Sequence, residues 1–449
     1  MSDNKTSVLQ ERELYLLPTR VSEWSLLYAP LADALMLVSD DDVRQLADAI
    51  ECPDRATAET MEIIDGLCNV TPVWERDNHV RNSNDFINLS ILPNNICNFS
   101  CSYCYSAKGR SSKQLDFEKA KHAVDFFLSP SRNTSKKLTV SIFGGGEPLI
   151  SWHSVVNPII TYLYQKADQQ ERKITTTIIT NGSIIPEGFV SACRKYAIDL
   201  VCSYEILKDV QNAQRKHFEL VTGNIAELIS NGIVPRINSV ITEINVDRQC
   251  EMIETVGCRF PEIHYISFEP VIDADIPDKH GFYTKFATSF LAAKSLADRY
   301  GIRLSCSALR NIDVTVDRYC AGELALCADG ALSICPCVSS AEEPNYQEYV
   351  YGHVSEYGVS IDERKLHDLL SHNLYRQSCC KDCFAKWNCG GGCMNTYLLN
   401  GNRPDTDYCR FMKSFLKYML TERLDNTYIE ETGSSIKEKI GEYGYFLTE

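Results

Sequence analysis

Three cysteines, Cys97, Cys101 and Cys104, follow the spacing C-x3-C-x2-C. Cysteine thiolates ligate iron–sulfur clusters, and three of them can hold three irons of a cubane 4Fe–4S cluster. The fourth iron is then left without a protein ligand and can bind a small molecule, which turns an electron carrier into a catalyst. The alternatives are a zinc knuckle or three ordinary buried thiols. A structural zinc site takes four ligands, and this stretch has no histidine to supply the fourth.

A glycine-rich bend with the sequence GGGEP spans residues 144–148, directly after a strand predicted at 138–143. Glycine lets the backbone approach a ligand closely and adopt unusual dihedral angles. The carbonyls of such a turn can accept hydrogen bonds from an ammonium group. A second turn, with the sequence TNG at 180–182, ends the next predicted strand. Asn-Gly is also common in ordinary turns, so this second signal is weaker.

Seven further cysteines form a second spaced set in the last third of the chain. They follow C-x9-G-x4-C, then C-x2-C-x5-C-x3-C, then a final C, at Cys320, Cys335, Cys380, Cys383, Cys389, Cys393 and Cys409. The chain has 20 cysteines in all. Grouped cysteines in a reducing compartment indicate metal binding rather than disulfides. Structural zinc is the simplest alternative for this set.

From residue 85 the hydrophobic pattern alternates between strands and helices. The predicted strands are 86–92, 138–143, 174–180, 200–206, 236–241 and 264–268. The predicted helices are 117–127, 155–165, 187–196, 216–230, 252–256 and 285–297. Six strand–helix units predict an α/β fold with a parallel sheet. In a (β/α) barrel the chemistry lies at the C-terminal ends of the strands, and the cysteine triplet follows the first strand.

Composition excludes several classes of protein. The net charge of −15 argues against a basic nucleic-acid surface. No apolar run approaches the ~20 residues of a membrane span, and the charged first residues lack the apolar core of a secretory signal. We therefore expect a cytoplasmic protein that binds neither nucleic acid nor membrane.

The cysteine triplet, with Tyr103 just before its last member, resembles the signature of the radical SAM superfamily. The resemblance implies a 4Fe–4S cluster whose open iron chelates S-adenosyl-L-methionine (SAM). It also implies reductive cleavage of SAM to methionine and a 5′-deoxyadenosyl radical, which abstracts a hydrogen atom from the substrate. The cofactor then carries the hard chemistry, and the protein supplies binding and orientation. The implied catalytic and metal-binding residues are Cys97, Cys101 and Cys104.

The same resemblance implies further SAM contacts. The bend at 144–148 matches the GGEP motif of the family, which binds the amino group of SAM. Ser203 matches a serine that faces the SAM ribose, but Glu205 and Ile206 replace the usual Asp and Gly, so a role for residue 205 stays open. Arg215 resembles a SAM-contacting arginine, although a solvated charge explains it equally well. The expected SAM-binding residues are Tyr103, Gly145, Gly146, Glu147, Pro148, Asn181, Ser203 and Arg215.

The second cysteine set resembles the SPASM domain in every interval, which implies two auxiliary iron–sulfur clusters. By resemblance one is bound by Cys380, Cys383, Cys389 and Cys409, and the other by Cys320, Cys335 and Cys393. Some relatives place an eighth ligand six residues upstream of the first cysteine, where this chain has Val314. Cys379 competes with Cys380, but the spacing favours Cys380. The candidates for the eighth position, if that iron is not open, are Cys306, Cys327 and Cys337.

These resemblances predict a partial (β/α)6 TIM-like barrel at 85–305, a SPASM domain at 306–425 and a tail at 426–449. Residues 1–84 show three short apolar runs and then two helices, the first of them capped by Ser39. This order resembles the winged-helix-like peptide-recognition domain fused to many peptide-modifying radical SAM enzymes. A packing extension of the barrel is the alternative.

The function expected from these matches is that of a radical SAM peptide maturase, an oxidoreductase acting on a ribosomally made precursor peptide. The expected product is a thioether or carbon–carbon cross-link, and the electron donor is of flavodoxin or ferredoxin type. Formylglycine formation, as in sulfatase-maturing relatives, is the alternative. It is disfavoured because Pro336 follows Cys335 where those relatives place an Asp. A non-catalytic, zinc-stabilised peptide-binding protein is the distant alternative.

Overall fold

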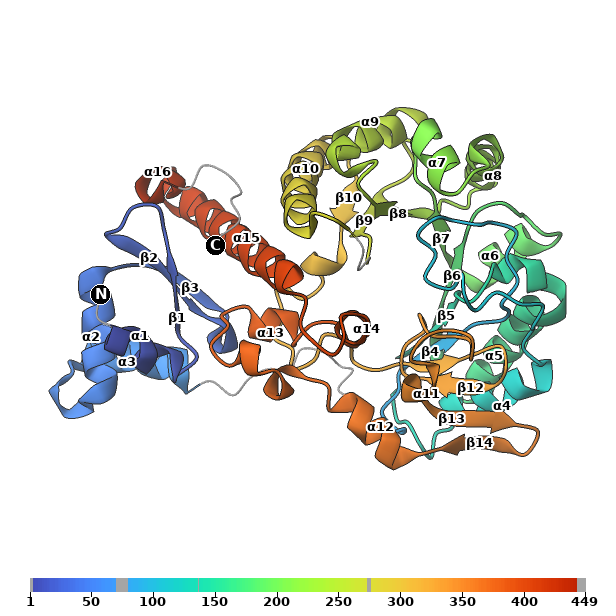
Figure 1. Ribbon diagram of the computed structural model, residues 1–449, viewed down its shortest axis with the longest axis horizontal. Helices are drawn as coiled ribbons and strands as arrows, with labels where there is room; N and C mark the ends of the chain where they lie inside the picture. Colours follow the sequence, from blue (N-terminus) through green and yellow to red (C-terminus); the bar gives the residue numbers. More distant parts are fainter. Residues whose placement is uncertain (1–2, 70–79, 136, 273–275, 442–449) are drawn as a thin grey trace.

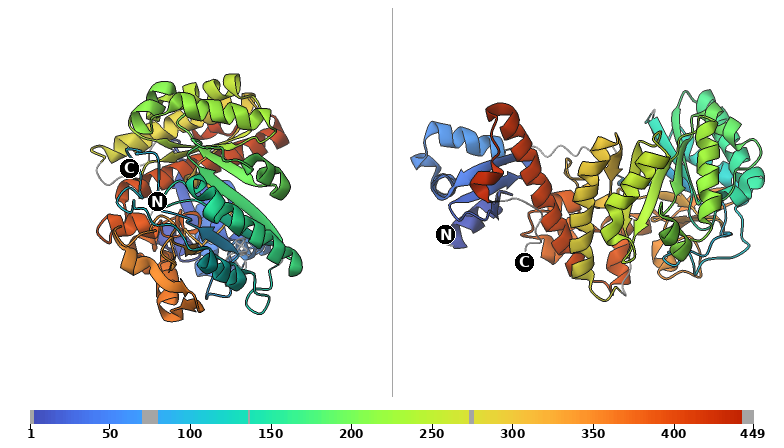
Figure 2. Two further views of the ribbon diagram at one scale, coloured as in Figure 1. Left: turned by 90° about the vertical axis from the view of Figure 1, so that its right-hand side faces the viewer. Right: turned by 90° about the horizontal axis from the view of Figure 1, so that it is seen from above.

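The computed structural model describes residues 3–69, 80–135, 137–272 and 276–441. Figure 1 shows an elongated molecule, with a small sheet at one end and a large curved sheet at the other. The short helices α13 (Lys386–Cys389) and α14 (Met394–Leu399) lie between the two sheets. The view from above in Figure 2 shows the same order along the long axis.

Six neighbouring parallel strands form the centre of the large sheet, and helices cover its outer side (Figure 1). The strands are β4 (Asn88–Ile91), β5 (Lys137–Ile142), β6 (Lys173–Thr180), β7 (Asp199–Ser203), β8 (Arg236–Ile241) and β9 (Tyr265–Pro270). The main covering helices are α4 (Phe117–Leu128), α5 (Asn157–Gln169), α6 (Phe189–Tyr196), α8 (Phe218–Ser230), α9 (Gln249–Arg259) and α10 (Lys279–Arg299). The predicted α/β partial barrel is therefore confirmed.

Most of the predicted elements differ from the structure by a few residues at their ends, and two of these differences have a structural explanation. The strand predicted at 200–206 ends at Ser203, because the backbone turns at Ile206 with a φ of 67° and α7 (Lys208–Gln214) begins soon after. The short helix predicted at 252–256 extends in both directions as α9. It begins at Gln249, whose buried side chain donates to the backbone carbonyl of Phe286 on α10.

Alternation along the strands gives the large sheet two chemically different faces. Val140 and Ile178 belong to the buried core beneath the covering helices. Ser90, Ser141 and Thr177 are register partners on β4, β5 and β6, and they lie on the opposite, inner face. The inner side of the curve is therefore lined by hydroxyl groups rather than by an apolar core.

The cysteine-rich region adds four strands to the same sheet, which the sequence pattern did not predict. β11 (Leu324–Leu326) pairs in parallel with β4, and β12 (Ala331–Ser333), β13 (Val350–Ser355) and β14 (Gly358–Ile361) continue the sheet in antiparallel order. A short strand, β10 (Arg303–Ser305), extends the other edge in parallel with β9. Cys320 and Cys335, which flank the β11–β12 hairpin, are thereby placed beside the barrel.

The small sheet is an antiparallel meander, as the three apolar runs predict. It consists of β1 (Tyr15–Pro18), β2 (Trp24–Ala29) and β3 (Ala34–Ser39). Ser39 caps α2 (Asp40–Glu51) in a capping box with Asp42, and α3 (Ala58–Cys68) follows. A further helix, α1 (Asp3–Gln10), was not predicted. One face of the sheet packs on these helices and the other belongs to a second buried cluster with the long C-terminal helix.

That helix, α15 (Thr406–Thr432), holds the two sheets together. Phe411 and Phe415 make ring contacts with Phe286 and Phe290 on α10. Further along the same helix, Leu420 belongs to the buried cluster formed with the small sheet. The N-terminal region is thus attached to the barrel through α15.

The described part of the C-terminal segment, up to residue 441, is mainly helical. α15 passes through residue 425, where the sequence indicated that a tail begins, and Asp425 accepts hydrogen bonds from the Ser435 hydroxyl and the Ile436 backbone N–H. These bonds fix the turn into α16 (Lys437–Ile440). In the part of the chain described here, no helix is both long enough and apolar enough to cross a bilayer.

Candidate functional site

The cysteine triplet and the glycine bend lie directly against each other, at the C-terminal ends of β4 and β5. The backbone N–H of Glu147 donates to the carbonyl of Ile96, the residue before Cys97, at 2.7 Å. A Cβ at Gly146 would lie 2.0 Å from that same carbonyl oxygen, and a Cβ at Gly145 would lie 2.6 Å from the carbonyl of Asn94. Only glycine permits this approach.

Glu147 ties the bend to the end of β6. The residue is 2 % exposed, and its carboxylate accepts from the Thr180 hydroxyl at 2.7 Å and the Asn181 backbone N–H at 2.7 Å. Burial raises the pKa of Glu147, and the hydrogen bonds from Asn181 and Thr180 oppose that rise. The Asn181 side chain donates to Asn98 at 2.9 Å and lies 3.9 Å from Cys97 Sγ. The structure therefore brings the CxxxCxYC, GGEP and TNG motifs together.

Two more of the expected SAM-binding residues, Pro148 and Ser203, lie at the C-terminal ends of the parallel strands. Pro148 begins a short 3₁₀ helix, Pro148–Ser151, whose N-cap is the side chain of Glu147. Ser203 is the last residue of β7, paired in register with Asn238, and is half-buried on the same sheet face as Ile179. Both therefore lie close to the ends of the strands that carry the motifs.

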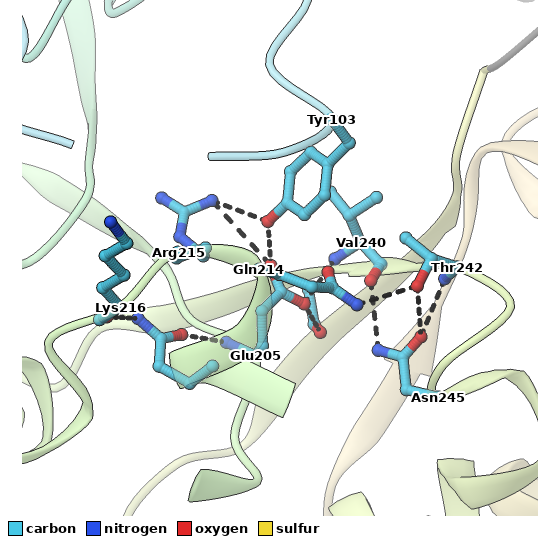
Figure 3. A network of polar contacts seen from close by, with 10 residues as sticks. Tyr103, Glu205, Gln214, Arg215, Lys216, Val240, Thr242 and Asn245 are labelled. Carbon is cyan, nitrogen blue, oxygen red and sulfur yellow. Dashed lines mark hydrogen bonds and ion pairs between the residues drawn. The ribbon is translucent and has the colours of Figure 1, made fainter. Parts of the chain in front are cut away.

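A buried network explains how Tyr103 and Arg215 are placed (Figure 3). Arg215 donates to the Tyr103 hydroxyl at 2.9 Å and pairs with the Glu205 carboxylate at 3.8 Å. The Tyr103 hydroxyl in turn donates to Glu205, which also accepts from the Ser239 hydroxyl at 2.6 Å and the Val240 backbone N–H at 3.0 Å. Glu205 is fully buried, and its hydrogen bond from Tyr103 holds the cysteine loop in place.

Opposing influences act on the pKa of the Glu205 carboxyl. Burial raises its pKa, while the Arg215 charge and hydrogen bonds from Ser239 and Tyr103 lower it. The neighbouring Gln214 carbonyl also accepts from the Ser102 backbone N–H at 3.0 Å. The C-terminal end of α7 and the segment after β7 therefore both hold the loop between Cys101 and Cys104.

Several buried polar atoms around the cysteine triplet have no hydrogen-bond partner among the described residues. They are Asn95 Oδ1, Ser106 Oγ, Arg110 Nε and Nη1, Gln214 Oε1 and Arg215 Nε. Buried polar groups are normally paired, so a concentration of unpaired ones marks room for a polar group that the chain does not itself supply. A cluster with a bound nucleotide fits this requirement.

The donor set favours iron–sulfur over zinc. A structural zinc ion takes four ligands, and the stretch 97–104 offers three cysteines and no histidine. Each cysteine of a 4Fe–4S cluster binds a different iron. Three thiols without a histidine therefore match the ligand set of such a cluster better than that of a zinc knuckle.

The cysteines of the C-terminal third fall into two groups. Burial and the charges of Cys393 and Cys335 raise the pKa of Cys320 to about 12. Burial and the charges of Cys409 and Cys383 raise the pKa of Cys389 to about 12. The first group lies beside β11 and β12, and the second lies around α13 and the start of α15. This division is consistent with the two auxiliary sets that the resemblance implies.

Cys379 and Cys380 both lie near the second group. Their sulfur atoms are 4.0 Å apart, and burial, followed by the charge of Cys379, raises the pKa of Cys380. The charge of Cys379 also raises the pKa of Cys409. Geometry alone therefore leaves Cys379 within reach of the same cluster.

Three cysteines were candidates for the eighth ligand of the auxiliary clusters, and of these Cys337 lies near Cys320, Cys335 and Cys393. Burial raises the pKa of Tyr349, and so do the charges of Cys335, Cys393, Cys337 and Cys320 in that order, which places this tyrosine among four thiols. Cys327 instead donates to backbone carbonyls of Ala325 and Val338, and Cys306 is buried beside Glu269. Both of these have the surroundings of structural thiols.

The sequence motifs missed two charged residues near the site. Arg110 donates to Cys104 Sγ at 3.1 Å. Glu323 accepts from the Ser90 hydroxyl on the inner sheet face at 3.0 Å, and burial raises its pKa to about 7 against the opposing effects of Ser90 and Arg310. The only sequence signal for either was proximity to a cysteine.

Comparisons with known proteins agree with this geometry. No family model matches the chain. It is 24% identical over 144 residues to "Radical SAM cyclopropyl synthase TigE" of Paramaledivibacter caminithermalis, covering 29% of each chain. It is 27% identical over 164 residues to an uncharacterized protein of Methanocaldococcus jannaschii, covering 35% of this chain and 54% of that one. The matches thus span less than two thirds of these relatives.

Solved structures match over a larger share of the chain. "Native anSMEcpe with bound AdoMet" has a TM-score of 0.58 at 16% identity, covering 76% of this chain and 98% of that one. Streptococcus suis SuiB bound to precursor peptide SuiA has a TM-score of 0.50 at 14% identity, covering 88% and 97%. These likenesses show the fold, and with the sequence match they confirm the resemblance to radical SAM enzymes of the SPASM type.

The buried network predicts that Glu205→Gln destabilises the protein. The amide cannot balance the Arg215 charge, and breaking a buried ion pair on one side costs about 3 kcal/mol or more. We expect a lower unfolding midpoint in denaturant, measured anaerobically. The matched control is Glu219→Gln, because Glu219 pairs with Lys208 on the surface and such pairs contribute little. Equal midpoints for the two variants would contradict this role of Glu205.

The raised pKa of Glu323 predicts a pH-dependent term in stability. The unfolded chain loses this proton near pH 4.5 and the folded chain near pH 7. In that window the folded state binds more protons, so stability falls as pH rises through it. Thermal unfolding between pH 5 and 8 should therefore show a shallower decline for Glu323→Gln than for the parent. Parallel curves, with the exposed Glu356→Gln as control, would count against the shift.

Proposed function

We propose that the chain is a radical SAM peptide maturase with two auxiliary clusters, acting on a ribosomally made precursor peptide. The observation that carries the proposal is the direct contact between the glycine bend and the residue before Cys97, at 2.7 Å. These two motifs lie together at the C-terminal rim of the sheet, where barrel enzymes place their chemistry.

Each motif has a defined role in this proposal. Cys97, Cys101 and Cys104 hold the 4Fe–4S cluster, which together with SAM supplies a 5′-deoxyadenosyl radical when both are bound. The backbone of the bend offers carbonyls to the SAM amino group, and Glu147 holds the bend rigid through its bonds to β6. Arg215 donates a hydrogen bond to the Tyr103 hydroxyl, and through Tyr103 it orients the cysteine loop.

The substrate side is the hydroxyl-lined inner face of the sheet. Ser141 and Thr177 are half-buried there, with no apolar core covering them. A peptide backbone needs hydrogen-bond partners of this kind when it leaves water. The likeness in fold to SuiB, described as bound to its precursor peptide, supports a peptide rather than a small metabolite as the substrate.

The N-terminal region is proposed to hold the precursor peptide. β1 and β3 are the two edge strands of the small sheet, and an edge strand can take up an extended peptide by strand addition. Because α15 attaches this sheet to the barrel, a bound leader would be tethered at a fixed distance from the radical site.

The two auxiliary clusters are proposed to accept the electron left after hydrogen abstraction or to bind the substrate. A thioether or carbon–carbon cross-link is the proposed product. The external reductant is of flavodoxin or ferredoxin type, and the proposed location is the cytoplasm, where the 20 unpaired thiols stay reduced. Pro336 in place of an Asp still disfavours formylglycine formation.

Incubation of the anaerobically reconstituted protein with SAM, dithionite and the precursor peptide encoded beside its gene tests the function. We expect 5′-deoxyadenosine and a peptide that has lost two hydrogen atoms, detected by mass spectrometry. The matched control replaces Cys97, Cys101 and Cys104 by Ala, which should abolish both products. Intact SAM and an unchanged peptide, from protein with full iron content, would refute the proposal.

Four cysteine thiols lie around Tyr349. Their grouping predicts that Cys337 is the fourth ligand of the auxiliary cluster at Cys320, Cys335 and Cys393. Cys337→Ala should lower iron per chain or convert this cluster to a three-iron form with its own EPR signal. Cys327→Ala, a nearby buried thiol, should keep the parent iron content. Parent-like iron content and spectra in Cys337→Ala would leave that iron without a cysteine ligand.

A further inference from the structure

Arg110 lies in the loop between Cys104 and α4 and belongs to none of the sequence motifs. Its Nη2 donates to Cys104 Sγ at 3.1 Å. Its Nε and Nη1 are buried and have no hydrogen-bond partner among the residues described in the structure. A buried guanidinium with two unused donor atoms is costly unless another acceptor occupies the site.

The position of this loop is fixed by the cysteine-rich region. A Cβ at Gly109 would lie 2.6 Å from the Glu343 carboxylate and 2.8 Å from Ser340, so only glycine fits between the two segments. The Glu343 carboxylate is itself held by the backbone N–H groups of Ser339, at 2.5 Å, and Ser340, at 3.1 Å. Arg110 is therefore held against Cys104 by a turn that follows Cys337.

Two carboxylates lie near Arg110. Burial lowers the pKa of Arg110, and the charges of Glu147 and Glu343 oppose that shift. Arginine keeps its proton in proteins, so the guanidinium remains a cation beside Cys104. Hydrogen bonds from charged donors are the strong ones, and hydrogen bonds to cluster sulfurs set the reduction potential.

We propose that Arg110 is a positioning residue of the SAM cluster: it holds the Cys104 thiolate with one N–H and directs its two spare donors at the sulfur atoms of the cluster. The inference rests on the function proposed above. A cation at this place stabilises the reduced, more negative cluster, and so raises its reduction potential. Arg110 thus makes it easier for an external donor to reduce the cluster before SAM is cleaved.

The test compares Arg110→Gln and Arg110→Lys with Arg132→Gln in the full-length, reconstituted protein. Arg132 is a matched control because its Nε is also buried without a partner, but its guanidinium contacts Ser83 and the Phe126 ring instead of a cysteine. The readouts are iron content, and an EPR redox titration of the signal that changes when SAM is added.

We expect Arg110→Gln to need a more negative potential for half-reduction, Arg110→Lys to lie between it and the parent, and Arg132→Gln to match the parent. Loss of iron in Arg110→Gln with retention in Arg132→Gln also supports the role, since the Cys104 thiolate then depends on Arg110. Parent-like iron and potential in Arg110→Gln would overturn it. If the parent signal itself ignores SAM, the proposed function fails, and not this inference alone.

Discussion

The close approach of the glycine bend to the Ile96 carbonyl is the contact on which the rest of the site depends. It requires β4 and β5 to be parallel neighbours in register, so that both loops leave the same end of the sheet. It also requires glycine at 145 and 146, because a side chain at either position would meet the backbone of the cysteine loop. The cysteines and the bend can therefore act on one ligand only while this contact holds.

A second constraint acts on the cysteine loop through Glu205. This residue follows β7 and joins Tyr103, Arg215 and β8 in one buried polar network (Figure 3). Such a network is costly to bury, and its hydrogen bonds and ion pair fix the positions of the side chains that it joins.

The sequence predicted the strand–helix series and both cysteine sets because each is written locally, in hydrophobic period or in spacing. It did not predict that β11 joins β4, since a pairing between residues near 90 and 325 leaves no local pattern. The same holds for Arg110 and Glu323, whose importance comes from burial beside other segments. Ser203 was expected from a motif, and its strand neighbours followed only from the register of the sheet. The C-terminal end of β7 was predicted three residues too late, because the sequence gives no local signal for the positive φ at Ile206.

We propose that one iron of the cluster held by Cys97, Cys101 and Cys104 lacks a protein ligand and binds SAM. Electron–nuclear double resonance of the reduced protein, with SAM labelled by ¹⁵N at its amino group, detects such binding at the iron itself. We expect a nitrogen coupling to the cluster that disappears when Cys101 is replaced by Ala. Protein with full iron content and no such coupling would contradict it.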